Sequence, residues 1–137
     1  MNPATIHPPH ALLAAYNDRD WERFGDRLAV DAIYEEIARP ARVVEGREQI
    51  VAVFRAWAEA VPEARARIRR EVIGTDSIAF EIEWLGGEAE QFGDFRPTGR
   101  RPLARAAAYF LVDGLEVREF RHFYDSLVLY QVLGIGG

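Results

Sequence analysis

His122 is the side chain best suited to acid–base catalysis at neutral pH. An unperturbed imidazole titrates near pH 6.5, so it takes up and releases protons with little adjustment. The alternative is a ring that fills the floor of a cavity with one nitrogen bonded to a neighbour, and the residues leave both interpretations open. The other histidines, His7 and His10, flank two prolines with no third ligand nearby, which argues against a metal site. The chain has no cysteine and no lysine, which excludes thiolate nucleophiles and Schiff-base chemistry.

Two carboxylates, Asp125 and Glu36, are candidates to assist such a base, and each also has a structural interpretation. Asp125 directly precedes a closing apolar stretch and is well placed to cap a helix there. Glu35 and Glu36 are adjacent in a strand pattern, so one of them faces each side of the sheet. The positions of Ile33 and Ile37 indicate that Glu36 faces water.

Glu81 and Glu83 form a second carboxylate pair, which we expect to be structural. They alternate with an apolar face made of Ile78, Phe80, Ile82 and Trp84. Because successive strand residues point to opposite faces, this alternation sends both glutamates to solvent.

Aromatic residues are spread over every segment expected to face a pocket. Those predicted to line a binding site are Tyr16, Tyr34, Phe54, Trp57, Trp84, Tyr109, Phe120 and Tyr124. Aromatic residues at helical or strand spacing are mostly core. A buried tyrosine hydroxyl still needs a polar partner, which a ligand carbonyl or hydroxyl can provide.

The periodicity predicts helices first and strands afterwards. One kinked helix or two short helices cover about residues 9–28, a strand covers 31–37, and a helix opens at 46–48 and ends at Pro62. Four strands are expected at 65–74, 77–86, 103–112 and 115–125, with a short closing helix at 127–133. The close spacing of the strands favours antiparallel hairpins. This order is typical of an α+β domain whose helices pack on a curved antiparallel sheet and leave a cavity for a small ligand.

Length and composition indicate one globular domain. The chain has 137 residues, of which 49% are hydrophobic and 28% charged. We expect a single domain over residues 1–137, with residues 1–8 flexible. No apolar run approaches the roughly 20 residues of a membrane helix, and no signal peptide is evident. The net charge of −5 argues against nucleic-acid binding. Together with the missing cysteines, these features fit a cytoplasmic protein.

Short motifs in order along about residues 10–134 resemble the SnoaL-like polyketide cyclase family of the nuclear-transport-factor-2-like superfamily. They are Tyr16-Asn17-x-x-Asp20-Trp21, Asp31-Ala32-x-Tyr34-Glu35-Glu36, Gly46-Arg47-Glu48-x-Ile50, Phe54-x-x-Trp57, Pro97-Thr98-Gly99-Arg100, Asp113-Gly114 and Phe120-Arg121-His122-Phe123-Tyr124-Asp125. The resemblance implies a cone-shaped, barrel-like curved sheet with the N-terminal helices on its concave face, enclosing a cavity. Relatives of this kind often pair through the outer sheet face, so a homodimer is expected.

The resemblance also assigns positions to the candidate site. His122 stands where epoxide hydrolases of the superfamily carry an aspartate, and Asp125 matches a second common family aspartate. Glu36 stands where ketosteroid isomerases carry their catalytic aspartate, which implies that it lies inside with Tyr34. This conflicts with the indication from Ile33 and Ile37, so the face of Glu36 stays open. Glu81 and Glu83 replace the arginine and aspartate of the epoxide hydrolases, which counts against epoxide hydrolysis.

The oxyanion donors of the isomerases have no match either. Leu12 and an alanine of the run 106–108 occupy those positions approximately. Without such donors enolisation loses several kcal/mol of stabilisation, so steroid isomerase activity is not expected.

The leading hypothesis is a small enzyme that abstracts a proton next to a carbonyl, leading to aldol cyclisation or isomerisation of a largely apolar substrate. His122 is the expected general acid/base, helped by Asp125 or Glu36, with no cofactor and no metal. The alternative from another class is a non-catalytic module that binds a hydrophobic small molecule. An epoxide hydrolase is a third possibility, and it requires Arg105 or Arg121 to turn inward beside a carboxylate.

Overall fold

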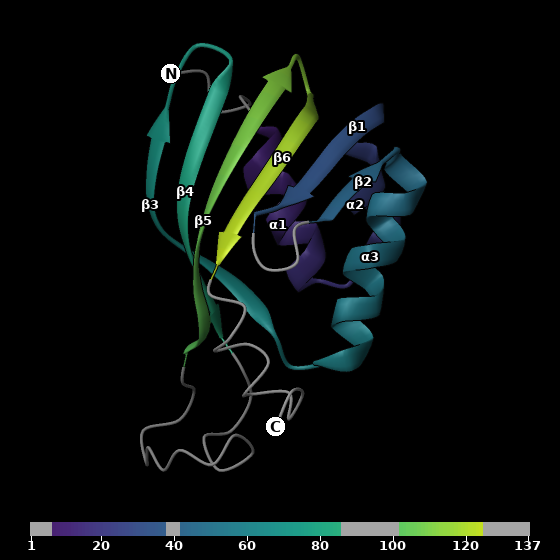
Figure 1. Ribbon diagram of the computed structural model, residues 1–137, viewed down its shortest axis with the longest axis vertical. Coiled ribbons are helices and arrows are strands. Elements are labelled where there is room, and N and C mark those ends of the chain that lie inside the picture. Colours follow the sequence, from purple (N-terminus) through teal and green to yellow (C-terminus); the bar gives the residue numbers. More distant parts are fainter. Residues whose placement is uncertain (1–6, 38–41, 86–101, 125–137) are drawn as a thin grey trace.

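The computed structural model describes residues 7–37, 42–85 and 102–124, the side chains of 102–104 and 124 excepted. It has three helices and six strands within these residues (Figure 1). In chain order they are α1 (Pro8–Asn17), α2 (Trp21–Asp26), β1 (Leu28–Glu36), β2 (Arg42–Glu45), α3 (Arg47–Ala60), β3 (Arg65–Ile73), β4 (Ser77–Leu85), β5 (Pro102–Asp113) and β6 (Glu116–Tyr124).

The strands form one curved sheet in the order β2-β1-β6-β5-β4-β3 (Figure 1). The α+β fold expected from the sequence is confirmed. Its edge strands β2 and β3 do not pair with each other within the described residues, so the sheet is open rather than closed into a barrel. One contact departs from the antiparallel expectation, because β1 and β6 pair in parallel. That pairing sets Glu36 directly beside His122 across the two strands.

The three helices cover one face of this sheet, with α3 against β1 and α1 against β3 (Figure 1). Aromatic rings fill the space between the layers. The Tyr34 ring on β1 packs edge-on against Phe54 of α3 at 4.9 Å and Phe120 of β6 at 5.0 Å between centroids. Edge-to-face pairs at such distances add stabilisation beyond the area they bury.

The break between α1 and α2 settles the alternative left open by the sequence in favour of two helices. The Asp20 carboxylate caps α2 by accepting a hydrogen bond from the Arg23 N–H at 3.2 Å. Arg19 adopts φ +58°, a left-handed conformation that turns the chain sharply. The Asn17 side chain then bonds both backbone groups of Ala66, donating at 2.9 Å and accepting at 2.7 Å, which fixes the end of α1 to β3.

The other predicted elements match the structure closely in position. β3 to β6 lie within a few residues of the four expected strands, and α3 begins after Gly46 as expected. Strand β2 was not predicted, since Arg42–Glu45 is short and lacks clear alternation. The first helix begins at Pro8, inside the segment expected to be flexible. The closing helix at 127–133 lies outside the described residues.

Candidate functional site

His122 lies on the inner face of β6, 5% exposed, with a hydrogen-bond partner at each ring nitrogen. The indole N–H of Trp84, on β4, donates to Nε2 at 3.1 Å. Nδ1 lies 3.0 Å from the hydroxyl oxygen of Tyr34. That hydroxyl in turn donates to Oε2 of Glu36 at 3.3 Å. We call Trp84, His122, Tyr34 and Glu36 the buried relay.

The donors of the buried relay determine which nitrogen of His122 carries the proton. An indole nitrogen only donates, so Nε2 of His122 must be the unprotonated, accepting atom. In a neutral ring the proton then sits on Nδ1, which donates to the Tyr34 oxygen. Tyr34 passes its own proton toward Glu36. Every hydrogen bond of the relay therefore points from Trp84 toward the carboxylate.

Burial lowers the pKa of His122 from 6.5 to about 3. A charged ring in this apolar surrounding would lose its hydration. Protonation would also set an Nε2–H against the N–H of Trp84, which removes the bond between them. His122 is therefore a neutral imidazole across the physiological pH range.

Glu36 is buried on the same face as Tyr34, 7% exposed, against the indication from Ile33 and Ile37 that it faces water. The inward positions of β1 at this end are 32, 34 and 36, while Ile37 lies past the last strand residue and is exposed. Arg42 of β2 lies opposite Glu36 in the ladder, with Nε 3.6 Å from Oε1. A half-exposed arginine thus faces the outer end of the relay.

Glu83 lies on the outer face of the sheet, as the alternation predicted, but arginines cover it and keep it from solvent. It is 5% exposed and receives hydrogen bonds from Arg67 and from Arg69, the latter at 2.9 Å. Burial alone would raise the pKa of Glu83, but the hydrogen bonds from Arg69 and Arg67 outweigh it and hold the pKa below its usual value. Glu81 beside it is half-exposed and also faces Arg69, at 3.6 Å. Both glutamates belong to an ion-pair network away from the relay.

The remaining predicted pocket residues divide between the two faces. Those buried in the core or packed against it are Tyr16, Tyr34, Phe54, Trp57, Trp84 and Phe120. The prediction that Tyr109 lines the pocket is wrong. The inward positions of β5 are 106, 108 and 110, and Tyr109 is 40% exposed on the outer face. The side chain of Tyr124 and all of Asp125 lie outside the described residues.

Two features of the site were not predicted from the sequence. One is the bond from Trp84 to His122, since Trp84 was expected only as a pocket wall. The other is Arg42, whose place beside Glu36 depends on the unpredicted strand β2. An arginine six residues after a glutamate in a strand is a weak signal without knowledge of the hairpin between them.

Among the described residues, no group of three or more histidine, aspartate or glutamate side chains is arranged to hold a metal ion. No helix among the described residues has the length and apolar character needed to span a bilayer.

Comparison with known proteins agrees with the observed fold. The sequence profile of the SnoaL-like polyketide cyclase family matches residues 10–133. No curated protein matches the chain significantly.

Several solved structures share the fold. A Catenulispora acidiphila protein with a ketosteroid isomerase-like fold, in complex with trimethylamine, has 21% identity and a TM-score of 0.72 over 96% of this chain and 95% of that one. TerC, co-crystallised with polyporic acid, has 11% identity and a TM-score of 0.74 over 93% and 95%. An LEH-like epoxide hydrolase of M. tuberculosis has 16% identity and a TM-score of 0.67 over 92% and 86%. At such low identities the likeness concerns the fold alone.

Proposed function

The chain belongs to the SnoaL-like polyketide cyclase family, and from this premise we propose that it catalyses cofactor-independent proton transfer next to a carbonyl in a small, largely apolar substrate. The observation that carries the proposal is the buried relay, which connects a carboxylate to a neutral imidazole through one tyrosine hydroxyl. The ligand complexes of the Catenulispora protein and of TerC support small-molecule binding by this fold.

Glu36 is the proposed base of the reaction. Its carboxylate takes the proton from the carbon beside the substrate carbonyl, and an enolate forms. Once Glu36 is protonated, it no longer competes as strongly for the Tyr34 hydroxyl, which is then available to donate to the enolate oxygen. In an isomerisation Glu36 next returns its proton to carbon. In an aldol closure the enolate carbon attacks a second carbonyl, and the alkoxide that forms takes the proton back from Glu36.

The proposed role of His122, which the sequence favoured as the general acid/base, is instead that of a neutral ring that supports Tyr34. Its Nδ1–H donates to the Tyr34 oxygen and thereby strengthens Tyr34 as a donor to the enolate. With a pKa of about 3, the ring is a poor acceptor of a substrate proton at neutral pH, so the direct base is Glu36. Asp125 keeps its proposed assisting role on the resemblance alone.

Two other functions agree less well with the side chains of the site. A non-catalytic binding module needs no inward carboxylate, whereas Glu36 and His122 both face the interior. Epoxide hydrolysis requires an inward arginine. Arg105 and Arg121 lie instead on the outer face, where they pair with Glu81 at 3.6 Å and with Glu35 at 3.5 Å, respectively.

The test is exchange of carbonyl-adjacent protons in D₂O, followed by ¹H NMR over a panel of small ketones and aromatic polyketides. We expect the wild type to accelerate exchange of at least one compound, and Glu36→Gln to reduce the rate by about 10²-fold or more. The matched control is Glu35→Gln, since Glu35 is adjacent in sequence but pairs with Arg121 on the outer face. Exchange by Glu36→Gln at the wild-type rate would refute the proposal. Saturable binding with no exchange of any compound would favour the binding module.

We also propose that the chain forms a homodimer through the outer face of the sheet. Tyr109 and Phe123 are each 40% exposed there, on the neighbouring strands β5 and β6. Charged residues flank them, as at the rim of many interfaces. Sedimentation analysis should give a dimer mass that Phe123→Glu converts to a monomer, and a monomeric wild type at high concentration would contradict this.

A further inference from the structure

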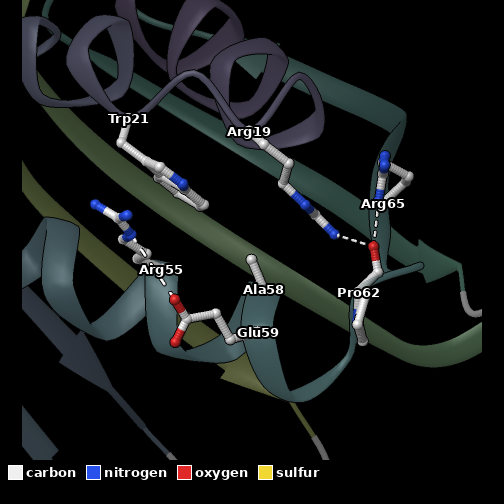
Figure 2. Close-up of a pocket in the computed structure, with 7 residues that line it drawn as sticks. All are labelled: Arg19, Trp21, Arg55, Ala58, Glu59, Pro62 and Arg65. Carbon is white, nitrogen blue, oxygen red and sulfur yellow. Dashed lines mark hydrogen bonds and ion pairs between the residues drawn. The ribbon is translucent and has the colours of Figure 1, made fainter.

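A groove of about 460 Å³ lies outside the buried relay, where the turn between α1 and α2 meets the end of α3 and the start of β3. Figure 2 shows Arg19 and Trp21 on one side and Arg55 with Glu59 on the other. Arg65 closes the end near β3. None of these side chains belongs to the buried relay, so the groove needs an explanation of its own.

The groove carries more positive than negative charge. Three guanidinium groups face one carboxylate, and that carboxylate, Glu59, is 3.9 Å from Arg55 on the same helix. Arg19 and Arg65 form no ion pair within the described residues. Among the described residues this leaves a local excess of positive charge, which an anion would neutralise.

Backbone carbonyls hold these two cations in place. Arg19 donates to the carbonyl of Pro62 at 2.6 Å, and Arg65 donates to the same oxygen at 2.9 Å (Figure 2). Both also donate to the carbonyl of Ala64, at 2.9 Å each. Carbonyl oxygens orient a guanidinium but do not neutralise it. A guanidinium has five N–H donors. The described bonds of Arg65 occupy only its NH1 nitrogen, which leaves donors for a ligand.

Burial and the nearby charge of Arg65 lower the pKa of Arg19. Burial is the larger of these two causes. The left-handed backbone of Arg19 sets where its side chain begins, and the hydrogen bonds to the Pro62 and Ala64 carbonyls hold the guanidinium in place.

Trp21 adds a flat apolar surface next to these charges. Its indole is half-buried and rests edge-on against Tyr16 at 5.6 Å and Phe24 at 5.7 Å. In Figure 2 the ring lies between Arg19 and Arg55 on the groove wall. A planar ring can pack on such a surface while an attached anion reaches the guanidinium groups.

We propose that this groove binds a small aromatic carboxylate, with the carboxylate on Arg65 and the ring against Trp21. The site is separate from the proposed reaction centre, although one aromatic ring connects them. Tyr16 contacts Trp21 on the groove side and Trp84 of the relay at 5.3 Å on the other.

The test is isothermal titration of the full chain with benzoate, benzamide and inorganic phosphate. We expect saturable benzoate binding that weakens with added NaCl, and weaker binding of both other compounds, because benzamide lacks the charge and phosphate lacks the ring. Arg65→Gln should weaken benzoate binding about tenfold or more, the loss expected for a charge-assisted hydrogen bond. Arg55→Gln should weaken it less, since that arginine already faces Glu59. The matched control is Arg118→Gln, an exposed arginine of β6 that does not line the groove.

Three results would overturn the proposal: no saturable benzoate binding, equal binding of benzoate and benzamide, or unchanged binding by Arg65→Gln. If phosphate bound as tightly as benzoate, the proposed packing of the ligand ring against Trp21 would be wrong. If Arg65→Gln does not fold, the comparison of the three compounds and the Arg55→Gln variant still test the proposal. A negative result for benzoate would not affect the proton-exchange test, because Glu36 does not line the groove.

Discussion

Lowering the pH should destabilise this protein through His122 in a way that one substitution can isolate. The pKa of His122 is about 3 in the folded chain and near 6.5 when unfolded. The unfolded chain therefore binds a proton that the folded chain does not, between those two values. The stability supported by the neutral ring is complete above about pH 6.5 and is lost progressively as the pH falls toward 3.

The size of the effect follows from the two pKa values. Because the unfolded chain takes up this proton more readily, the free energy of unfolding should be lower by about 2 kcal/mol at pH 5 and about 3 kcal/mol at pH 4 than at pH 7.5. Carboxylates also titrate in this range, so the total pH dependence of the wild type mixes several groups. His122→Gln cannot take up the proton, and the other groups are shared by both proteins. The difference between their pH dependences therefore isolates the histidine.

The assay is urea unfolding of the wild type and His122→Gln at pH 7.5, 6, 5 and 4, followed by circular dichroism. The free energy of unfolding should fall more steeply for the wild type, by about 2 kcal/mol between pH 7.5 and 5. Parallel curves for the two proteins would refute the burial of a neutral His122. His122→Asn provides a second comparison if the glutamine variant does not fold.

Three further substitutions, one of them with a matched control, test other parts of the structure. Trp84→Phe keeps the ring but removes the N–H that Nε2 of His122 accepts, so it should cost about 1–2 kcal/mol in urea unfolding and raise the pKa of His122 in an NMR titration. Glu83→Gln should lower the free energy of unfolding by about 1–3 kcal/mol, because it removes the charge of a buried carboxylate held by two partly exposed arginines. The control Glu81→Gln, at a half-exposed position, should lower it by less than about 1 kcal/mol. Equal losses in the two variants would contradict the difference in burial. Gly46→Ala should lower the free energy of unfolding by about 1–3 kcal/mol, because φ +98° is a conformation for glycine, and no change in thermal unfolding would show that the backbone relaxes.

The order and type of the long elements could be predicted because each has a clear period. The alternation Ile78, Phe80, Ile82 and Trp84 defines the inner face of β4, and all four are buried. The faces of Glu36 and Tyr109 could not be read in the same way. On β1 the signal came from Ile37, which lies beyond the strand, and on β5 alanines carry the inner face at 106 and 108.

The relay could be predicted in its residues but not in its connections. His122, Glu36, Tyr34 and Trp84 all appear among the expected site residues. Their hydrogen bonds depend on the parallel pairing of β1 with β6 and on strand order across the sheet. Those are long-range pairings, which local periodicity does not encode.

The protonation site of His122 is the most direct test of the buried relay. Long-range ¹H–¹⁵N correlation spectra of ¹⁵N-labelled protein distinguish the two neutral tautomers from imidazolium, and His122→Gln assigns the signal among the three histidines. At pH 6.5 we expect a neutral ring protonated at Nδ1, with Nε2 unprotonated and unchanged down to pH 5. A proton on Nε2, or an imidazolium at pH 6, would contradict both the hydrogen bond from Trp84 and the direction of the relay toward Glu36.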